Sequence, residues 1–543
     1  MSLSTHRREA GEWPRFLLLG VVAVALAVVL ALGSLAGAGN GRLRAVGQSA
    51  SLLPATSLTA RVATVWNCPG PLNLSGGSAS ISVANAGSHA ARIVLQVAES
   101  AIVPGLTASH RLAPQLSREV VPAGSELTIP LKEAAVPPRL RAGLGRKAKG
   151  SKAKSRVHLR VYGAASLTVS GAAVAVSETA EQKRAVETSP CALGSSTRGY
   201  TAAGTTYDSS NLRLALFDPS AAPAVVNLSI GTSQGLAMPQ ALQGIVVPPE
   251  SLAVVNLDRY VPQQARVAVA AEASVGHIVI GSLTNVAAHF TAASLGHRHS
   301  YLEEGKELAV GVGEPLRALS FSYGPSGPAD SESVGLFNPA SRPARVVVAV
   351  TAAGRSSHQS VVVGPGATLS VPLPSLGATG GRAPGRLTAA QAALPAGTGG
   401  YVTLRSESGL GIVADHETVV ATSPGHLLLL TAPVGARAER SWLLAGAVRT
   451  KALGFELSLT DASKRPETAS VQLIGGASSS PAPEAVALQP GITAGLDLAK
   501  VAGVAGAFGV LVRGDGPLLV AGALIPAGSV ALPAFGGAAV ASP

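Results

Sequence analysis

The sequence predicts an all-β protein made of tandem two-sheet sandwiches that follow a single N-terminal transmembrane helix. Three observations predict this fold class. A unit of about 120 residues recurs four times along the 543-residue chain. Within each unit, short segments rich in Val, Ile and Thr are separated by turns that contain Pro or Gly, which is typical of β-strands. One uncharged apolar segment near the N-terminus is long enough to cross a bilayer.

The composition excludes several other classes of protein. Hydrophobic residues make up 47% of the chain and charged residues 13%, so the chain is too apolar and too weakly charged for intrinsic disorder. Its 62 glycines follow no three-residue period, which excludes a collagen-like helix. With 2 cysteines, the chain is neither a disulfide-dense scaffold nor a multi-cysteine metal protein.

The apolar segment spans residues 16–36, FLLLGVVAVALAVVLALGSLA. Three arginines precede it, and they favour a cytoplasmic N-terminus. A signal peptide cleaved at the small residues 36–38 is the alternative, although the apolar region of a signal peptide is usually shorter. In both cases the bulk of the chain is extracytoplasmic. The uncleaved signal-anchor predicts a single-pass protein of the cell membrane.

Cys68 and Cys191 are the two cysteines of the chain. Outside the cytoplasm, a disulfide is the expected state of such a pair. The bridge would close a long loop, which is worth on the order of 4–5 kcal/mol in the chain-entropy model. Two buried free thiols are the alternative. A catalytic cysteine is not favoured, because neither residue has a neighbouring histidine in the sequence.

An aromatic residue followed four positions later by glycine marks each of the four units. Aromatic residues are only 3% of the chain, so this regular spacing is informative. We expect each aromatic to pack in the core of its unit, where it would supply much of the buried area. A platform that stacks against sugars is the functional alternative. The four pairs are Trp66 and Gly70, Tyr200 and Gly204, Tyr323 and Gly327, and Trp442 and Gly446.

Two further markers repeat in step with the aromatics. The first is an Asx turn, as in LFDPS and LFNPA, at Asn85, Asp218, Asn338 and Asp461. The second is a strand–turn–strand segment such as VVPPES, which begins at Val120, Val246, Val362 and Ala487. The fourth unit departs from the pattern because Ala462 replaces the proline after the Asx residue. Strands with turns every 8–12 residues or so are typical of immunoglobulin or fibronectin type III sandwiches. The alternatives are a β-propeller, whose blades are shorter, and a helix-rich repeat.

These signals divide the chain into consecutive regions. We expect a cytoplasmic tail at 1–15, the signal-anchor at 16–38, a linker at 39–60, and β-sandwich repeats at 61–190, 191–312, 313–432 and 433–543. The four repeats would form a tethered rod, and the loops of such rigid sandwiches commonly carry binding.

A basic tract at residues 139–156 interrupts the first repeat. It contains no acidic residue, and we expect it to be a long loop between two strands. Outside the cytoplasm, nucleic acid is not an expected partner, whereas lipid headgroups or an anionic wall polymer would release counter-ions on binding. A solvated loop with no specific partner is the alternative. The predicted polyanion contacts are Arg139, Arg141, Arg146, Lys147, Lys149, Lys152, Lys154 and Arg156.

Residues with the types and spacings that catalysis requires are scarce. The best candidates for an enzyme are Ser233, in a Gly-x-Ser-x-Gly segment, and the run Asp415, His416 and Glu417. Pro239 interrupts the helix that should follow such a serine. The histidines at 289, 297 and 299 have a spacing that metals can use, but no carboxylate completes an obvious ligand set. We therefore expect no catalytic residue, no cofactor and no metal ligand, and a protein that is not an enzyme.

The Trp-x-Cys-Pro-Gly segment at 66–70, the LFDPS and LFNPA turns and the VVPPES-type turns together resemble an actinobacterial family catalogued only as a domain of unknown function. The resemblance covers most of residues 16–540. Members of that family are membrane-anchored, exported proteins rich in Ala and Gly, often encoded beside a large membrane glycosyltransferase. The resemblance implies a cell-envelope setting and a partner in polysaccharide assembly, and it carries over no catalytic residue.

The predicted function is that of a non-catalytic, membrane-anchored extracytoplasmic scaffold of the bacterial cell envelope, which assists glycan assembly. Its expected partners are the membrane, through one helix, and an envelope protein such as a glycosyltransferase. The first alternative is a protein that binds wall glycan or another polyanion through the basic tract. The second alternative is a cryptic glycan-modifying enzyme.

Overall fold

The protein is described by a computed structural model, which covers residues 56–57, 64–75, 78–102, 109–133, 160–170, 173–182, 185–202, 204–292, 299–323, 331–352, 354–373, 399–423, 426–434, 438–449, 453–475, 483–498, 506–526, 535–536 and 538–541. All of these residues belong to one compact unit, Ala50–Pro543. They form β-strands, turns and two short 3-10 helices, η1 (Gln240–Leu242) and η2 (Leu257–Arg259). The all-β class is therefore confirmed for this part of the chain. It holds no helix that is long and apolar enough to span a membrane, and the predicted segment 16–36 lies outside it.

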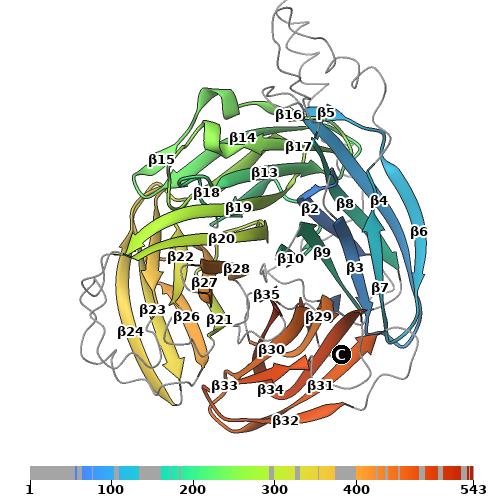
Figure 1. Cartoon of the computed structure of the whole chain (residues 1–543), viewed down its shortest axis with the longest axis vertical. Helices are drawn as coiled ribbons and strands as arrows, with labels where there is room; N and C mark the ends of the chain where they lie inside the picture. The colour runs from blue at the N-terminus through green and yellow to red at the C-terminus, as the bar shows by residue number, and fades with distance from the viewer. Residues whose placement is uncertain are drawn as a thin grey trace, which may run out of the picture. The chain divides into compact units, whose positions relative to one another are not determined.

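The strands fall into four consecutive blocks with one shared order (Figure 1). Each block has a front sheet, which contains the strand with the repeated aromatic, and a back sheet, which contains the strand that ends at the Asx turn. In each block the chain passes between these sheets several times before it moves on, as in Greek-key sandwiches. The repeat read from the sequence is thus a repeat of strand pairing. Its boundaries and its likeness to immunoglobulin domains stay predictions.

Block 1 has a front sheet of β11 (Ala192–Leu193), β2 (Thr64–Asn73), β8 (Arg160–Ser170) and β4 (Ala91–Ile102), with β5 (Ser109–Arg111) and β6 (Gln115–Val121) both paired to β4. Its back sheet runs β10 (Ala185–Pro190), β9 (Val174–Gln182), β3 (Ser78–Asn85) and β7 (Ser125–Leu131). Block 2 has a front sheet of β12 (Arg198–Thr201), β18 (Ala268–Val275) and β14 (Ala224–Thr232), with β15 (Gly235–Ala237) and β16 (Ile245–Val247) paired to β14. Its back sheet runs β17 (Ser251–Asn256), β13 (Asn211–Asp218), β19 (Val279–Ala292) and β20 (His299–Val310).

Block 3 has a front sheet of β21 (Ala318–Tyr323), β26 (Gly400–Ser406), β23 (Ala344–Ala352) and β24 (Arg355–Val363), and a back sheet of β25 (Thr368–Pro372), β22 (Ser331–Phe337), β27 (Val413–Ser423) and β28 (His426–Val434). Block 4 is built from β29 (Glu439–Arg449), β30 (Leu453–Asp461), β31 (Glu467–Gly475), β32 (Glu484–Leu488), β33 (Thr493–Asp497), β34 (Gly506–Pro526) and β35 (Phe535–Gly536). The long β34 serves both of its sheets, because residues 506–514 pair with β29 and β31 while residues 518–526 pair with β30.

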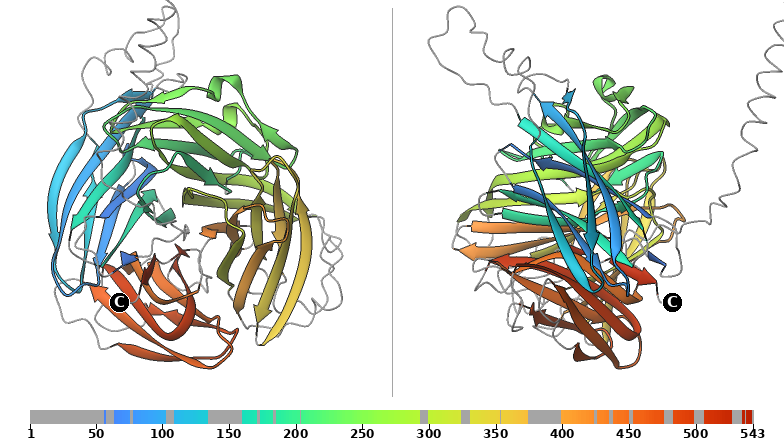
Figure 2. Two further views of the ribbon diagram at one scale, coloured as in Figure 1. Left: turned by 180° about the vertical axis from the view of Figure 1, so that it is seen from behind. Right: turned by 90° about the vertical axis from the view of Figure 1, so that its right-hand side faces the viewer.

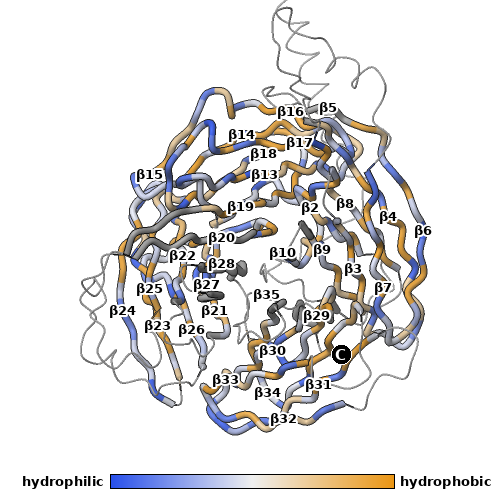
Figure 3. Tube along the Cα trace, viewed as in Figure 1, coloured by the Kyte–Doolittle hydropathy of each residue, from blue (hydrophilic) through white to orange (hydrophobic). Residues whose placement is uncertain are grey.

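Each block has its own hydrophobic core, to which both of its sheets contribute. Buried apolar residues alternate with less buried residues along strands such as β4 and β14, and the colours along both strands change accordingly in Figure 3. This period of two turns one face of each sheet toward the core. Trp66 and Trp442 are fully buried and Tyr200 is 9% exposed, whereas the side chain of Tyr323 lies outside the described residues. Trp66 and Trp442 belong to the core clusters of blocks 1 and 4, whereas Tyr200 belongs to a separate cluster that includes Phe337 of block 3.

The glycine four positions after the aromatic has a positive φ wherever it is described, and in blocks 1 and 4 it forms a bulge in the first strand. Gly70, Gly204 and Gly446 all have positive φ angles, of 69°, 146° and 82°. The register of β2 shifts around Gly70, and that of β29 shifts around Gly446. Because a side chain is disfavoured at such backbone angles, the repeated glycine has a conformational reason. Gly327 lies outside the described residues.

The Asx residue of each block caps its turn with its own side chain. The amide of Asn85 donates to three backbone carbonyls, and Asn338 repeats this pattern in block 3. In block 4, Asp461 Oδ1 accepts from the backbone N–H of Ser463 at 2.7 Å, just as Asp218 Oδ1 accepts from Ser220 at 2.8 Å. The turn therefore forms without a proline after the Asx residue, where block 1 has Ala86 and block 4 has Ala462, since the cap needs only the side chain of the Asx residue.

Consecutive blocks meet front sheet to back sheet. The front sheet of block 1 packs on the back sheet of block 2 through a cluster that includes Tyr162 and Phe217. Tyr200 of block 2 packs with Phe337 of block 3. The front sheet of block 4 packs on the back sheet of block 1, where Leu443 and Ala175 share a cluster. In both Figures 1 and 2, the red strands of block 4 lie beside the blue strands of block 1.

The block contacts therefore form a closed cycle, and the expected rod of sandwiches is wrong. At the same end, β1 (Thr56–Ser57) pairs with β36 (Ala538–Ala541), which pairs in turn with β29, so segments from both ends of the compact unit join the sheet of block 4. The sequence pattern sets which face of a strand is apolar, but each sheet also has an outer face. A series of head-to-tail contacts between outer faces forms a closed cycle only when the rotation from each block to the next allows it. That rotation is set by tertiary packing.

Candidate functional site: buried acids at the block junctions

A pair of residues on the back sheet of each block lies at the junction with the preceding block. One residue of the pair stands three positions before the Asx residue, and the other pairs with it on the neighbouring strand. We call this pair the receiving position. The pairs are Ser82 with Ser177, Ala215 with Gly281, Gly335 with Asp415, and Ser458 with Ala521. All of these residues are small except Asp415, which places an acid at the junction between blocks 2 and 3.

The junction between blocks 2 and 3 contains a buried ionic cluster. Arg266 lies just before β18, beside Gly204, since the N–H of Val267 donates to Gly204 O at 2.7 Å. Its guanidinium donates to both carboxylate oxygens of Asp415 at 3.1 Å and also contacts Glu417. The side chains of Arg266 and Asp415 are 10% and 2% exposed. Glu307 on β20 is buried in the same cluster.

Burial dominates the protonation of this cluster. It raises the pKa of Glu307 well above its usual value, and the neighbouring Asp415 and Glu417 raise it further. Burial also raises the pKa of Asp415 to about 6, although Arg266 partly opposes this shift. Burial lowers the pKa of Arg266, but the attraction of Glu417 and Asp415 outweighs it and leaves the pKa above its usual value. The guanidinium thus remains charged while at least one carboxyl is poised to hold a proton.

Gly335 makes room for this cluster. It pairs with Asp415 across β22 and β27, and a side chain there would collide with the guanidinium of Arg266 and with Asp415. The equivalent residues of the other blocks are Ser82, Ala215 and Ser458. Sequence analysis named Asp415 and Glu417 but missed Arg266. An alignment of the four repeats could have indicated a junction, because acids stand in block 3 where the other blocks have small residues.

The catalytic candidates do not converge on one site. Asp415 and Glu417 face Arg266, whereas His416 points to the opposite face of β27, as strand alternation requires. There His416 Nε2 lies 2.9 Å from Glu332 Oε2, and its ring packs on Phe321 with centroids 4.6 Å apart. Ser233 is exposed in the turn between β14 and β15. The four residues therefore occupy three separate environments.

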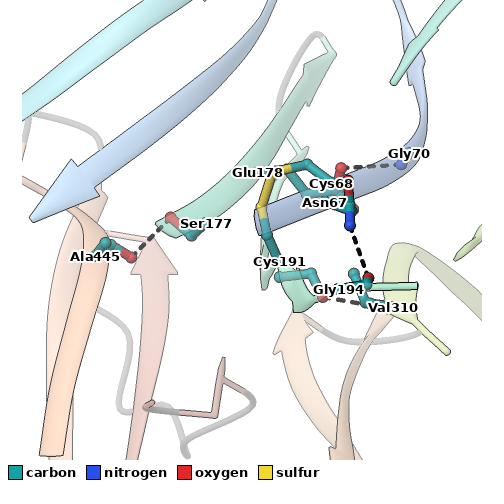
Figure 4. The surroundings of a disulfide bond; sticks show 10 residues. Asn67, Cys68, Gly70, Ser177, Glu178, Cys191, Gly194, Val310 and Ala445 are labelled. Carbon is teal, nitrogen blue, oxygen red and sulfur yellow. Dashed lines mark hydrogen bonds between the residues drawn. A yellow bond between two sulfur atoms is a disulfide. The ribbon is translucent and has the colours of Figure 1, made fainter. Parts of the chain in front are cut away.

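The predicted disulfide between Cys68 and Cys191 is confirmed. It joins β2 to the residue that follows β10, and both residues are buried. Beside it, Glu178 Oε2 accepts a hydrogen bond of 2.9 Å from the N–H of Gly70, the bulge glycine (Figure 4). Burial raises the pKa of Glu178 to about 8, and this hydrogen bond only partly opposes the shift.

The bulge of block 1 also contacts block 2. A Cβ atom on Gly281 would collide with the carbonyl oxygen of Gly70, so glycine at the receiving position of β19 allows the two strands to approach. Glu178, which holds the N–H of Gly70, therefore supports the conformation of the segment that docks on block 2.

The junction between blocks 4 and 1 repeats this arrangement with a carboxylate from the other block. Ser177 Oγ donates to the carbonyl of Ala445 at 2.9 Å, as Figure 4 shows, and the N–H of Gly446 donates to both oxygens of Glu126 at 3.2 and 3.3 Å. Glu126 keeps some solvent exposure, and the burial that remains raises its pKa to about 8 against the opposing hydrogen bonds. A carboxyl thus holds the bulge N–H in both block 1 and block 4.

The junction between blocks 3 and 4 is uncharged among the described residues. Thr460 Oγ1 lies 2.7 Å from Thr493 Oγ1 and donates to Ser322 Oγ at 3.1 Å. Thr493 Oγ1 donates to the carbonyl of Gly400 at 2.8 Å. Hydroxyl groups here replace the ion pairs of the preceding junction.

Several predicted site residues lie outside the described residues. The whole basic tract, Arg139 to Arg156, falls between the end of β7 and the start of β8, in a stretch that the structure does not describe. His297 also lies outside, and the side chains of residues 289 and 299 are not described. In the described part of the chain, no group of three or more His, Cys, Asp or Glu residues is arranged to hold a metal ion.

Residues 147–380 match the model of a family of unknown function, DUF5719. The match covers less than half of the chain and includes all of block 2 with parts of blocks 1 and 3. It supports the resemblance to a domain of unknown function. An actinobacterial origin and a neighbouring glycosyltransferase gene stay predictions. Neither a curated protein nor a solved structure matches the chain.

Proposed function

We propose that this protein is a non-catalytic, membrane-anchored scaffold of the bacterial cell envelope, which holds an envelope partner outside the cytoplasm. Four immunoglobulin- or fibronectin-type sandwiches would form the scaffold, and residues 16–36 would anchor it. The proposed partner is a membrane protein of glycan assembly, such as a glycosyltransferase.

The closed cycle of block contacts is the observation that carries this proposal. Each block is fastened to the next through its outer faces, and block 4 is fastened to block 1. Such an arrangement restricts relative motion of the blocks, whereas a catalytic cleft between domains commonly needs that motion. The chemically reactive candidates Asp415, Glu417 and His416 have structural partners within this cycle. Rigid blocks with loops at their edges suit a binding role.

Crosslinking in intact membranes tests the proposal. The full chain would be crosslinked at native abundance and purified, and its partners would be identified by mass spectrometry. We expect one envelope protein of glycan assembly to be enriched reproducibly. The matched control replaces the buried Arg266 by Met, which loosens the cycle while leaving the anchor in place. If no envelope protein is enriched with the unaltered chain, the scaffold proposal is wrong.

Mass spectrometry of the mature N-terminus tests the anchor separately. An N-terminus upstream of residue 16 is expected for the signal-anchor. An N-terminus near residue 39 would instead identify a cleaved signal peptide, and the tether would have to be abandoned.

Polyanion binding is the second candidate function, and the position of the basic tract favours it. The tract connects β7 in the back sheet of block 1 to β8 in its front sheet, and the exposed described residues nearest to it are Lys132, Glu133 and Arg160. Binding to purified anionic wall polymer should weaken steeply with salt, because each neutralised charge releases counter-ions. A variant with all eight basic residues of the tract changed to Gln should lose this binding. Salt-independent binding, or binding that survives the substitutions, would contradict it.

A further inference from the structure

The junction between blocks 2 and 3 holds more negative charge than its one described cation can balance. Glu307 and Asp415 are each 2% exposed, and Glu417 completes the set of three carboxyls around Arg266. Arg266 hydrogen-bonds to Asp415 and Glu417, whereas Glu307 Oε1 is buried without a hydrogen-bond partner. The described groups that face Glu307 are Arg266, Asp415, Glu417 and the hydroxyl of Thr284.

With every group ionised, three carboxylates and one guanidinium would leave two uncompensated negative charges in a buried site. Burial of an uncompensated charge is costly, and such groups usually take up a proton instead. Glu307 is the carboxyl best placed to hold the proton, because the guanidinium is already engaged by the other two acids.

We propose that Glu307 is a proton-operated latch of this junction: the contact is tight while Glu307 is protonated and loosens when Glu307 ionises. The placement of the residue supports this role. Glu307 lies on β20, and four residues of that strand, Leu302–Gly305, pair in parallel with β28 of block 3. This pairing joins the back sheets of the two blocks into one eight-stranded sheet. Ionisation would place a third carboxylate against Asp415 and Glu417 directly beside that joint.

The direction of the pH dependence follows from proton binding. Burial raises the pKa of Glu307, so at pH values above the ordinary carboxyl range the closed junction binds a proton that the open junction does not. Stability of the junction is therefore greatest at mildly acidic pH and falls as the pH rises toward the pKa of the closed state. Asp415, with a pKa of about 6, contributes in the same direction over a narrower range.

Hydrogen–deuterium exchange of the full chain in detergent tests the latch. Exchange would be measured at pH 5.5, 7 and 8.5 and corrected for the intrinsic pH dependence of the exchange rate. In peptides from β19, β20, β27 and β28, we expect protection to fall by up to about tenfold per pH unit. Peptides from β30 and β33, at the uncharged junction, should keep their protection.

Glu307→Gln is the decisive variant, because it keeps the shape of the side chain and cannot ionise. Between pH 7 and 8.5, above the pKa of about 6 for Asp415, protection in the same four strands should no longer change with pH. Glu272→Gln is the matched control, since Glu272 is an exposed partner of Arg198 and its loss should leave the wild-type pH dependence unchanged. An identical pH dependence in the wild type and in Glu307→Gln would overturn the proposal.

A spectroscopic measurement covers the case in which Glu307→Gln does not fold. In a chain that carries Glu126→Gln and Glu178→Gln, which removes two other glutamates whose pKa is raised to about 8, the infrared band of a protonated carboxyl should persist at pH 7 and disappear at alkaline pH together with the loss of protection. If that band is absent at pH 7 in this chain, or in the folded wild type, which serves as the upper limit for the band, Glu307 is ionised in the closed junction and the latch does not exist.

Discussion

The junction between blocks 2 and 3 and the junction between blocks 3 and 4 use equivalent surfaces of the repeat but opposite chemistry. The first places Arg266 against Asp415 and Glu417, while the second joins Thr460 and Thr493 to Ser322 and a backbone carbonyl. The receiving position is Gly335 with Asp415 in one case and Ser458 with Ala521 in the other. The same repeated fold can therefore place different side-chain chemistry at each of its junctions.

The two chemistries have different consequences for stability. Removing one partner of a buried ion pair leaves an uncompensated charge, which is strongly destabilising. Removing one hydroxyl from a network costs far less, because neighbouring groups can still pair. The comparison thus predicts a hierarchy of effects, which substitutions at the junctions can test.

Arg266→Met should have the largest effect. It leaves three buried carboxyls without their cation, and we expect a loss of about 3–5 kcal/mol in the free energy of unfolding at pH 7. Chemical denaturation of the full chain in detergent would measure it. Arg198→Met is the control, since its pair with Glu272 is exposed and should contribute at most about 1 kcal/mol. Equal effects of the two substitutions would show that burial of the cluster does not matter.

Glu178→Gln should change the pH dependence of stability. The raised pKa of about 8 means that the folded state alone holds this proton between the ordinary carboxyl range and that value, so wild-type stability should fall as the pH rises through this window. Each pH unit in the window costs about 1.4 kcal/mol. Melting temperatures at pH 5 and pH 9 should therefore differ less in the variant than in the wild type. A variant with an unchanged difference would mean that Glu178 is ionised when folded.

Gly446→Ala should destabilise the junction between blocks 4 and 1. The new Cβ atom would lie 2.5 Å from Ser177 Oγ at a positive φ, whereas Gly244 also has a positive φ but nothing within 4 Å. Gly244→Ala should cost about 1 kcal/mol, and Gly446→Ala should cost at least about 1 kcal/mol more. Adding Ser177→Ala should recover part of the extra loss, as measured by a double-mutant cycle. If the two glycine substitutions cost the same, the packed bulge does not contribute to this junction.

Thr460→Val should have the smallest effect. The substitution keeps the shape of the side chain and removes a buried hydroxyl, which should cost about 1–2 kcal/mol in the free energy of unfolding. Thr351→Val, at an exposed hydroxyl pair, is the control and should change stability by less than about 0.5 kcal/mol. A loss at Thr460 as large as that at Arg266 would remove the distinction between the two junctions.

Features within a single repeat could be predicted from the sequence. The glycine with a positive φ and the Asx turn depend on residues close together in the chain, and they lie in equivalent places wherever the structure describes them. The aromatics differ, because those of blocks 1 and 4 lie in block cores while Tyr200 packs against Phe337 of the next block. The disulfide between Cys68 and Cys191 was also predictable, because an exported chain with two cysteines leaves only one intramolecular pairing. The missing proline of the fourth unit proved unimportant, since Asp461 caps its turn directly.

The candidate site could be predicted only in part. Asp415 and Glu417 were singled out only as candidate catalytic residues of an enzyme, because their partner Arg266 lies 149 residues away from Asp415 in the chain. Glu126 and Glu178 carried no signal, since a glutamate in a strand usually faces solvent. Each is instead bound to the N–H of a bulge glycine, and Glu126 serves a glycine of another block.

The sequence by itself determined the strand alternation, the turns, the bulge glycines and the repeat, because each depends on the local backbone and on one buried face. The tertiary structure alone decided that block 4 returns to block 1 and that the acids of β27 meet an arginine of block 2. Those contacts join outer faces of sheets, and an outer face has no period of its own that distinguishes a neighbouring block from solvent. The rotation from each block to the next decides which outer faces meet, and no local sequence pattern encodes that rotation.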